Sequence, residues 1–304
     1  MNPSPAPDPQ PKADPEDDLL TILRDSPSIA ADSRRQAAFI PGDPARARSL
    51  RPEQVEAFNT QGIIGPFAVY DASQALANRT AFDALLASFR AQGKDSYAIN
   101  GFHDRCATIW DLATNPRILD LVEDLIGPDI VAWGTHFFCK MPGDGKTVGW
   151  HQDATYWPLT PTRTVTAWIA IDDSDLSNGG MQVVPGSHRH GPLPVVRSPP
   201  ETNNLLWEQV VGWEHLGKPA CIPLRAGECT LHSDLLLHGS EPNRSQRRRC
   251  GLTVRYAAAS VRSWKDWNGN AIRCRGEDRA SYWTHNPRPA DDRPFGAPVM
   301  FGSN

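Results

Sequence analysis

The sequence lacks the features that mark several large protein classes. Its six cysteines are scattered through 304 residues without paired spacing, so neither a disulfide scaffold nor a secreted protein is expected. No apolar run approaches membrane-spanning length, and the first residues show no basic and apolar leader. The formal net charge of −4 gives no indication of a polyanionic partner. We therefore expect a cytoplasmic protein that binds neither nucleic acid nor a membrane.

What the chain does contain is an ordinary globular composition, with 39% hydrophobic residues. All-β barrels often exceed 200 residues as one domain, so a single core with appendages fits this length. Residues 1–16 are rich in Pro, Asp and Ala, and we expect a disordered tail there because they bury little apolar surface. A single domain is expected over residues 17–304, in a protein that is a monomer or a homodimer.

Helical patterns dominate residues 17–128. The segment 52–61 has Pro52 in its first turn, Val55 and Phe58 on one face, and Gly62 as its stop. Further helices are expected at residues 17–24, 75–91 and 116–126, with a strand at residues 63–70. The region from about residue 50 to 128 is therefore predicted to be a helical support for the rest of the chain.

From Ile130 the apolar period changes to two, which is typical of strands. Gly and Pro clusters separate the runs, and Pro192–Gly217 reads as an insertion with weak periodicity. Strands are expected at residues 130–140, 147–155, 164–172, 181–184, 221–223, 228–232 and 249–257. This pattern predicts a barrel or sandwich core over about residues 130–257, with residues 258–304 as a polar extension that packs over it.

His151 and Asp153 are the strongest candidates for a metal site. In an extended strand, side chains two positions apart point to the same face, so this pair offers an imidazole and a carboxylate to one ion. His238, 87 residues downstream of His151, is the best candidate for a third ligand on a distant strand. Two histidines and one carboxylate form the facial triad of non-haem Fe(II) oxygenases.

A second His-x-Asp pair, His232 and Asp234, competes with this assignment. No arginine follows it at a comparable distance, so we interpret His232 as structural. The remaining histidines are expected to be ordinary polar residues, with His103 and His136 the best candidates among them to line a pocket.

Arg249 is expected to point into the core. Cys250, Leu252, Val254 and Tyr256 make one apolar face of the strand, so Arg249, Gly251, Thr253 and Arg255 face the opposite way, into the barrel. A buried arginine needs an anion, and a hairpin after His238 would set Arg249 near the metal. A dicarboxylate co-substrate fits, with one end on the metal and the other on the guanidinium. Arg247 and Arg248 are expected to be solvated.

Taken together, these motifs resemble one family. The motifs are, in chain order, His151-Gln-Asp153, Trp168 in a Thr-Ala-Trp-Ile-Ala strand, Asn178-Gly-Gly-Met181 before Pro185-Gly-Ser-His188, His238-Gly-Ser240, and Arg249. They are similar to the motifs of the phytanoyl-CoA dioxygenase family of Fe(II)/2-oxoglutarate-dependent oxygenases. The resemblance spans roughly Pro52 to Tyr256.

The resemblance implies a mainly β fold: a double-stranded β-helix core, jelly-roll or cupin-like, supported by N-terminal helices. It implies Fe(II) on His151, Asp153 and His238, and 2-oxoglutarate held by Arg249 with help from Ser240. By position, Trp168 flanks this co-substrate. Lys140 lies near the metal if the strands 130–140 and 147–155 pair as a hairpin.

The implied reaction is hydroxylation of an unactivated C–H bond of a small molecule, with O₂ consumed and succinate and CO₂ released. The residues expected to line the substrate pocket are Tyr156, Trp157, Phe138 and His136. Three alternatives stay open: a non-catalytic cupin-like binding protein, a Zn²⁺ hydrolase, and an oxygenase with another oxidative outcome such as halogenation or desaturation. Asp153 argues against a halogenase, which needs space for halide at that position.

Overall fold

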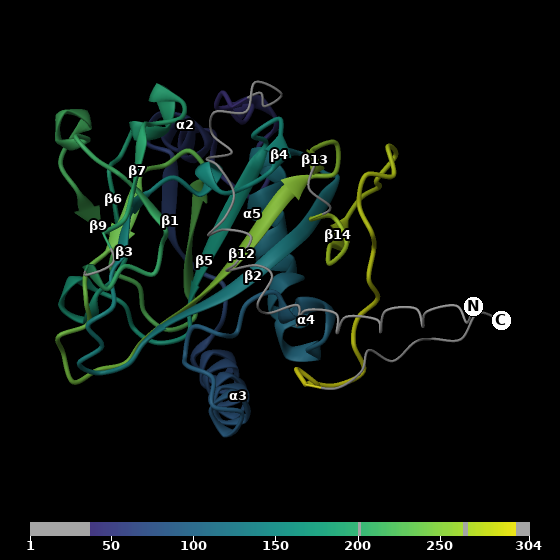
Figure 1. Ribbon diagram of the computed structural model, residues 1–304. Coiled ribbons are helices and arrows are strands. Elements are labelled where there is room, and N and C mark those ends of the chain that lie inside the picture. The colour runs from purple at the N-terminus through teal and green to yellow at the C-terminus, as the bar shows by residue number, and fades with distance from the viewer. Residues whose placement is uncertain (1–36, 200–201, 264–266, 296–304) are drawn as a thin grey trace, which may run out of the picture.

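The structure, a computed structural model, describes residues 37–199, 202–263 and 267–295. The expected tail over residues 1–16 and the expected helix over residues 17–24 lie outside the described residues. Figure 1 shows two facing sheets, with helices packed around the larger one. In the part of the chain that the structure describes, no helix is both long and apolar enough to cross a membrane.

The larger sheet has six antiparallel strands. Their order is β1 (Ile63–Ala68), β10 (Glu228–Ser233), β5 (Thr164–Ala170), β12 (Arg249–Ala258), β2 (Ile130–Lys140) and β14 (Ile272–Arg275). Strand neighbours in this sheet are far apart in the chain, as expected when successive strands alternate between two sheets. The strand predictions for β2, β5, β10 and β12 are confirmed to within about two residues.

The smaller sheet has four strands and faces the larger one. Their order is β3 (Val148–His151), β11 (His238–Ser240), β6 (Gln182–Val183) and β9 (Ala220–Cys221). Two further strand pairs lie outside these sheets: β4 (Leu159–Thr160) with β13 (Arg262–Ser263), and β7 (Val195–Arg197) with β8 (Glu208–Val210). These two facing sheets confirm the expected double-stranded β-helix.

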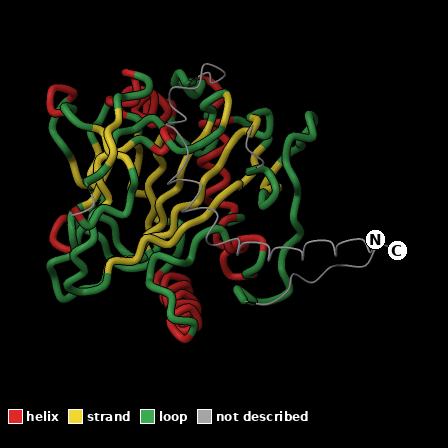
Figure 2. The backbone as a smooth tube through the Cα atoms, in the orientation of Figure 1, coloured by secondary structure: helices red, strands yellow, loops and turns green. Residues whose placement is uncertain are grey.

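The longer helices cover the outer face of the larger sheet, as Figure 2 shows in red. They are α2 (Pro52–Gln61), α3 (Ala72–Ala91), α4 (Ala107–Ala113) and α5 (Pro116–Ile126). The helix α2 ends because Gly62 adopts the left-handed region, with φ of 78°. The helix α3 begins three residues earlier than predicted because Asp71 caps it through the backbone N–H of Gln74. The sequence analysis did not predict α4, which has only seven residues.

Short 3₁₀ turns connect several of these elements. They are η2 (Pro44–Arg46), η3 (Phe102–Asp104), η4 (Asp153–Thr155), η5 (Leu176–Asn178), η6 (Ser187–His190) and η8 (Glu214–Leu216). The turn η4 follows β3 after a single residue, so the strand that carries His151 ends before Asp153.

The alternation predicted for the central strands places the core on one face of the larger sheet and polar groups on the other. Cys250, Leu252 and Val254 of β12 are fully buried against the helices. Val165 and Ile169 of β5 join the same cluster. The opposite face therefore carries the side chains that point between the two sheets, which is where the site lies.

Two expected hairpins are absent from the described strands, and both predictions were wrong. β2 and β3 lie in different sheets, and so do β11 and β12. The physical reason is the topology: each strand crosses to the facing sheet, so side chains from consecutive strands meet across the barrel and not along one ladder. The expected insertion over residues 192–217 contains β7, β8 and η8. Within the expected C-terminal extension, β14 adds an edge strand to β2.

Candidate metal centre

Three ligand atoms, from β3, from β11 and from the turn η4, converge on one point. His151 and His238 are cross-strand partners on β3 and β11, and Asp153 opens the turn after β3. Asp153 Oδ1 lies 3.7 Å from His151 Nε2 and 4.0 Å from His238 Nε2. All three donors lie within 4.8 Å of one another, so one ion can contact them all.

Both histidines are held in the tautomer that suits a metal. The Nδ1 atom of His151 lies 2.8 Å from the carbonyl of Gly149, and that of His238 lies 2.9 Å from the carbonyl of Leu236. Because a carbonyl only accepts, each Nδ1 carries the hydrogen and each Nε2 presents its lone pair toward the point that the three ligand atoms share. Burial also lowers the pKa of His238 to about 3, which keeps this ring neutral. The donor set therefore fits a divalent cation.

Asp153 supplies the negative charge of the site. Burial works to raise the pKa of its carboxyl, but the imidazoles of His151 and His232 beside it hold that pKa well below its usual range. The two oxygens of this carboxylate have different neighbours. Oδ1 faces the two histidine ligands, whereas Oδ2 accepts a hydrogen bond from the Thr166 hydroxyl at 3.3 Å and lies 3.8 Å from His232 Nε2. The carboxylate is thus ionised, and its Oδ2 atom is held in place by Thr166 and His232.

The metal ligands open into a partly open pocket between the two sheets. A concave site with a few convergent polar groups is the usual form of a small-molecule site. Besides the three ligands it is lined by Phe138, Val148, Trp168, Met181, His232, Gly239, Ser240, Arg249, Thr253 and Arg255. The structure thus brings His151, Asp153, His238, Arg249, Ser240 and Trp168 to one pocket, although they were predicted from separate motifs.

Arg249 lies in the wall of this pocket with only 2% of its surface exposed. Its guanidinium donates to the Ser240 hydroxyl and to the carbonyl of Phe138, each at 3.3 Å, and its Nε has no partner in the described residues. Burial lowers the pKa of Arg249. Among the described residues no carboxylate lies within ion-pair distance of it, so an acidic group from outside the chain fits this place.

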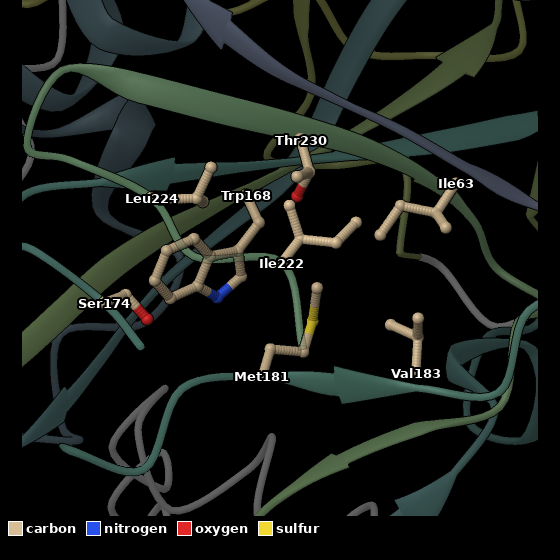
Figure 3. Close-up of a pocket in the computed structure, with 8 residues that line it drawn as sticks. All are labelled: Ile63, Trp168, Ser174, Met181, Val183, Ile222, Leu224 and Thr230. Carbon is tan, nitrogen blue, oxygen red and sulfur yellow. The ribbon is translucent and has the colours of Figure 1, made fainter. Parts of the chain in front are cut away.

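Trp168 forms the wall between this pocket and a smaller apolar cavity. Figure 3 shows its indole beside Leu224, Ile222 and Met181, which fill the space behind it. The guanidinium carbon of Arg249 lies 5.8 Å from the centre of the indole. The ring lies flat across Gly251, where a Cβ atom would be 2.1 Å from Trp168 Cζ2. Glycine at position 251 is therefore what allows Trp168 to reach Arg249.

Lys140 does not belong to this pocket. Its side chain is fully buried on the same face of β2 as Phe138, but its ammonium donates to the carbonyls of Ser240 and Glu241. Burial and the nearby Arg249 lower the pKa of Lys140 to about 7. Lys140 therefore holds the loop after β11, and its contact with the co-substrate stays a prediction.

The four residues expected to line the substrate pocket have different positions. Phe138 lines the pocket, and His136 packs against its ring at 4.2 Å while its Nε2 lies 2.8 Å from the carbonyl of Tyr97. Tyr156 lies beside His151, with ring centres 6.1 Å apart, and its hydroxyl donates to the carbonyl of Glu208. Trp157 belongs to an aromatic cluster at one end of the pocket.

Sequence reasoning gave no role to several residues that line this pocket, among them Met181, His232, Thr253 and Arg255. It also missed Thr166, whose hydroxyl donates to Asp153. The alternation of β12 had already placed Thr253 and Arg255 on the inner face, but no role was drawn from it. His232 was interpreted as structural because no arginine follows it at a comparable distance. The structure places it behind Asp153 and outside the group of three ligands.

The two neighbouring arginines behave differently from one another. Arg247 is exposed and pairs with Asp175 at 2.7 Å, as expected for a side chain at the strand entry. Arg248 was predicted to be solvated, and this was wrong. Its side chain is 13% exposed and pairs with Asp172 and Asp83, because the start of β12 is covered by α3.

Comparison with known proteins shows the family to which the chain belongs. Residues 58–251, more than half of the chain, match the family model described as phytanoyl-CoA dioxygenase. The peroxisomal phytanoyl-CoA dioxygenase of Bos taurus is 31% identical over 48% of this chain and 45% of that protein. The chain therefore spans about half the length of the curated relatives it matches.

Two solved structures share the fold over most of the chain. The apo form of the non-heme monooxygenase ThoJ is 28% identical, with a TM-score of 0.66 over 78% of this chain and 88% of that one. EctD from S. alaskensis, solved with 2-oxoglutarate and 5-hydroxyectoine, is 20% identical, with a TM-score of 0.65 over 79% of this chain and 89% of that one. The chain belongs to the phytanoyl-CoA dioxygenase family of Fe(II)/2-oxoglutarate-dependent oxygenases.

Proposed function

We propose that this protein is a dioxygenase that uses Fe(II) and 2-oxoglutarate to hydroxylate an unactivated C–H bond of a small molecule. O₂ is consumed, and succinate and CO₂ are released. The observation that carries the proposal is the pairing of two features in one pocket: a triad of His151, Asp153 and His238, and the buried Arg249 without an acidic partner among the described residues.

In this proposal His151, Asp153 and His238 hold the iron, which supplies the activation of O₂ when bound. The hydrogen bonds from each Nδ1 to a backbone carbonyl keep the two imidazoles oriented and neutral. Thr166 and His232 hold the second oxygen of Asp153, so that the carboxylate cannot rotate away. These residues set the position of the reaction within the pocket.

Arg249 and Ser240 bind the far carboxylate of 2-oxoglutarate. The guanidinium presents a planar fork to the two oxygens of a carboxylate, and the Ser240 hydroxyl adds a donor beside it. Trp168 and Met181 line this part of the pocket and exclude water. A dicarboxylate is thereby selected over a monocarboxylate, because only a dicarboxylate reaches both the arginine and the metal ligands.

Succinate formation tests the proposal. Purified protein with Fe(II), O₂ and 2-oxoglutarate is expected to release succinate slowly even without a substrate, and faster when a substrate is added. The control is the same protein treated with a chelator. If iron is bound and succinate does not exceed this control, the protein is a metal-binding relative without this activity, which is the main alternative.

A further inference from the structure

A second arginine, Arg255, points into the same pocket at the level of the metal ligands. It lies on the inner face of β12, six residues after Arg249. Its partner on β5 is Thr166, and the partner of Thr166 on β10 is His232. Thr166 and His232 are the residues that contact Asp153, so Arg255 belongs to the row of side chains nearest the metal site.

Two indoles lie side by side against the guanidinium of Arg255. Its central carbon lies 5.7 Å from the ring centre of Trp133 and 5.6 Å from that of Trp157. The two indoles are themselves 4.8 Å apart and nearly perpendicular. Trp133 is only 5% exposed, and its indole N–H has no hydrogen-bond partner in the described residues. This corner of the pocket therefore offers a cation and an unused donor.

The charge of Arg255 is not balanced by a carboxylate of its own. Within the described ranges no acidic side chain lies within ion-pair distance of it, whereas Arg248 and Arg275 each pair with two acids. Burial lowers the pKa of Arg255, and among the described residues Asp153, whose charge serves the metal, is the acid that acts on it. A partly buried guanidinium without a counter-ion of its own loses part of its hydration, and a ligand anion offsets that cost.

The sheet makes room for this side chain. Gly134 is the partner of Arg255 on β2, and a Cβ atom there would lie 3.3 Å from Arg255 Cδ and 3.4 Å from one of its terminal nitrogens. These contacts are tighter than usual, so a side chain at position 134 pushes the Arg255 side chain by a few tenths of an ångström. The side chain of Arg255 therefore lies over Gly134 and against the two indoles.

We propose that Arg255, which lies against the indoles of Trp133 and Trp157, binds a carboxylate group of the substrate, so that the substrate is a small organic acid. The planar guanidinium recognises the two oxygens of a carboxylate, and the indoles restrict it to one orientation. The inference rests on the proposed function, because it concerns the substrate of that reaction.

2-Oxoglutarate itself is not the ligand of Arg255 in this arrangement. Six residues along an antiparallel strand separate two Cα atoms by roughly 20 Å, so Arg249 and Arg255 stand at opposite ends of the pocket. Arg255 lies in the row of Thr166, which contacts Asp153, whereas Arg249 lies beyond Gly251 and Ala170. A five-carbon diacid that extends from the metal site to Arg249 leaves Arg255 free for the substrate.

The test is a binding measurement on protein loaded with Mn(II), which does not turn over, and 2-oxoglutarate. The probes are straight-chain carboxylates from acetate to octanoate, benzoate and phenylacetate, each compared with its primary amide by calorimetry at millimolar concentrations. At least one carboxylate is expected to bind while its amide does not. Arg255→Gln should weaken that carboxylate roughly 10- to 100-fold, and Arg255→Lys should recover part of the loss.

A matched control is Arg197→Gln. Arg197 also lies over an indole, 3.9 Å from the centre of Trp207, but it is exposed on β7 outside the pocket, so its loss should leave carboxylate binding unchanged. If Arg255→Gln does not fold, Gly134→Ala replaces it. That variant keeps every charge and shifts the guanidinium, and it should weaken the same carboxylate.

Three results would overturn the Arg255 site: equal binding of carboxylates and amides, no binding of any carboxylate, or wild-type affinity in both Arg255→Gln and Gly134→Ala. Substrate-free succinate formation by the wild-type protein tests the proposed function separately. Selective carboxylate binding without succinate overturns the proposed function and retains the anion site. Succinate formation without selective carboxylate binding retains the proposed function and overturns the anion site.

Discussion

His151 and His238 are direct cross-strand partners on β3 and β11, with imidazole centres 4.1 Å apart. Two residues separated by 87 positions in the chain thus become neighbours in one ladder. Asp153 comes from the turn that follows β3, so its carboxylate reaches the same point from a different backbone direction. The ligands therefore lie at one end of a packed sandwich. Because of this placement, a substitution of a ligand should remove the metal site and leave the fold intact.

Asp153→Ala should abolish iron binding and turnover while the protein stays folded. Removal of the carboxylate leaves two neutral imidazoles, which hold a divalent cation weakly. Iron content, succinate formation and the circular dichroism spectrum are the measurements. His190→Ala, at an exposed histidine away from the pocket, is the control and should behave as wild type. Normal succinate formation by the Asp153→Ala protein would show that the metal is held elsewhere.

Arg249→Ala should raise the apparent constant for 2-oxoglutarate by about thirty-fold to a thousand-fold, since a charge-assisted contact in a partly buried site contributes roughly 2 to 4 kcal/mol. Arg249→Lys keeps the charge but loses the planar fork, so it should recover only part of this. Arg247→Ala, at an exposed arginine, should change the constant by less than about threefold. Equal effects at positions 247 and 249 would contradict the inward direction of Arg249.

Arg248→Ala should lower stability and leave the constant for 2-oxoglutarate nearly unchanged. Arg248 pairs with the buried Asp172, which keeps only Arg79 as a partner when Arg248 is removed. The expected loss is roughly 1 to 3 kcal/mol in the free energy of unfolding. Urea unfolding measures it, and a change in 2-oxoglutarate affinity with unchanged stability would be inconsistent with this position.

His232→Phe should weaken metal binding about 10- to 100-fold without removing a ligand, because residues that orient a ligating carboxylate typically contribute that much. His232→Gln keeps an N–H donor toward Asp153 and should restore part of the affinity. A titration with Mn(II) separates this effect from catalysis. Equal Mn(II) affinities for His232→Phe and wild type would mean that His232 only fills space.

Gly251→Ala should disrupt the co-substrate pocket. A methyl group at this position lies 2.1 Å from Trp168 Cζ2, so the indole must move away from Arg249. Such overpacking costs roughly 1 to 3 kcal/mol. We expect a lower melting temperature and weaker 2-oxoglutarate binding. Gly269→Ala is the control, because a Cβ there meets no atom within 4 Å and should leave both quantities unchanged.

The protein should lose stability in mild acid, partly through His103. This side chain is fully buried, and burial lowers its pKa from 6.5 to about 4. Between these values the unfolded chain binds a proton that the folded protein does not, so the stability contributed above pH 6.5 is lost as the pH falls toward 4. His103→Gln should therefore reduce the difference in unfolding free energy between about pH 7 and pH 5 by roughly 2 kcal/mol. Urea unfolding at the two values of pH measures it, and an unchanged pH dependence would contradict this role.

The sequence by itself determined the local part of this site. The alternation of apolar residues placed Arg249 on the inner face of β12, and the same parity placed Thr253 and Arg255 there, because in a strand every second side chain shares a face. Helix bounds such as Pro52–Gln61 followed from proline and glycine, whose backbone preferences act over one or two residues. Such properties need no knowledge of a strand's neighbour.

Only the tertiary structure decided which strands face one another. Pairing depends on the burial of whole faces, so sequence distance did not reveal that β2 and β3 lie in opposite sheets or that Lys140 is held by Ser240 and Glu241. The same holds for His232 behind Asp153 and for Trp133 and Trp157 around Arg255. These contacts join segments far apart in the chain, and they exist only because the two sheets close over a common interior.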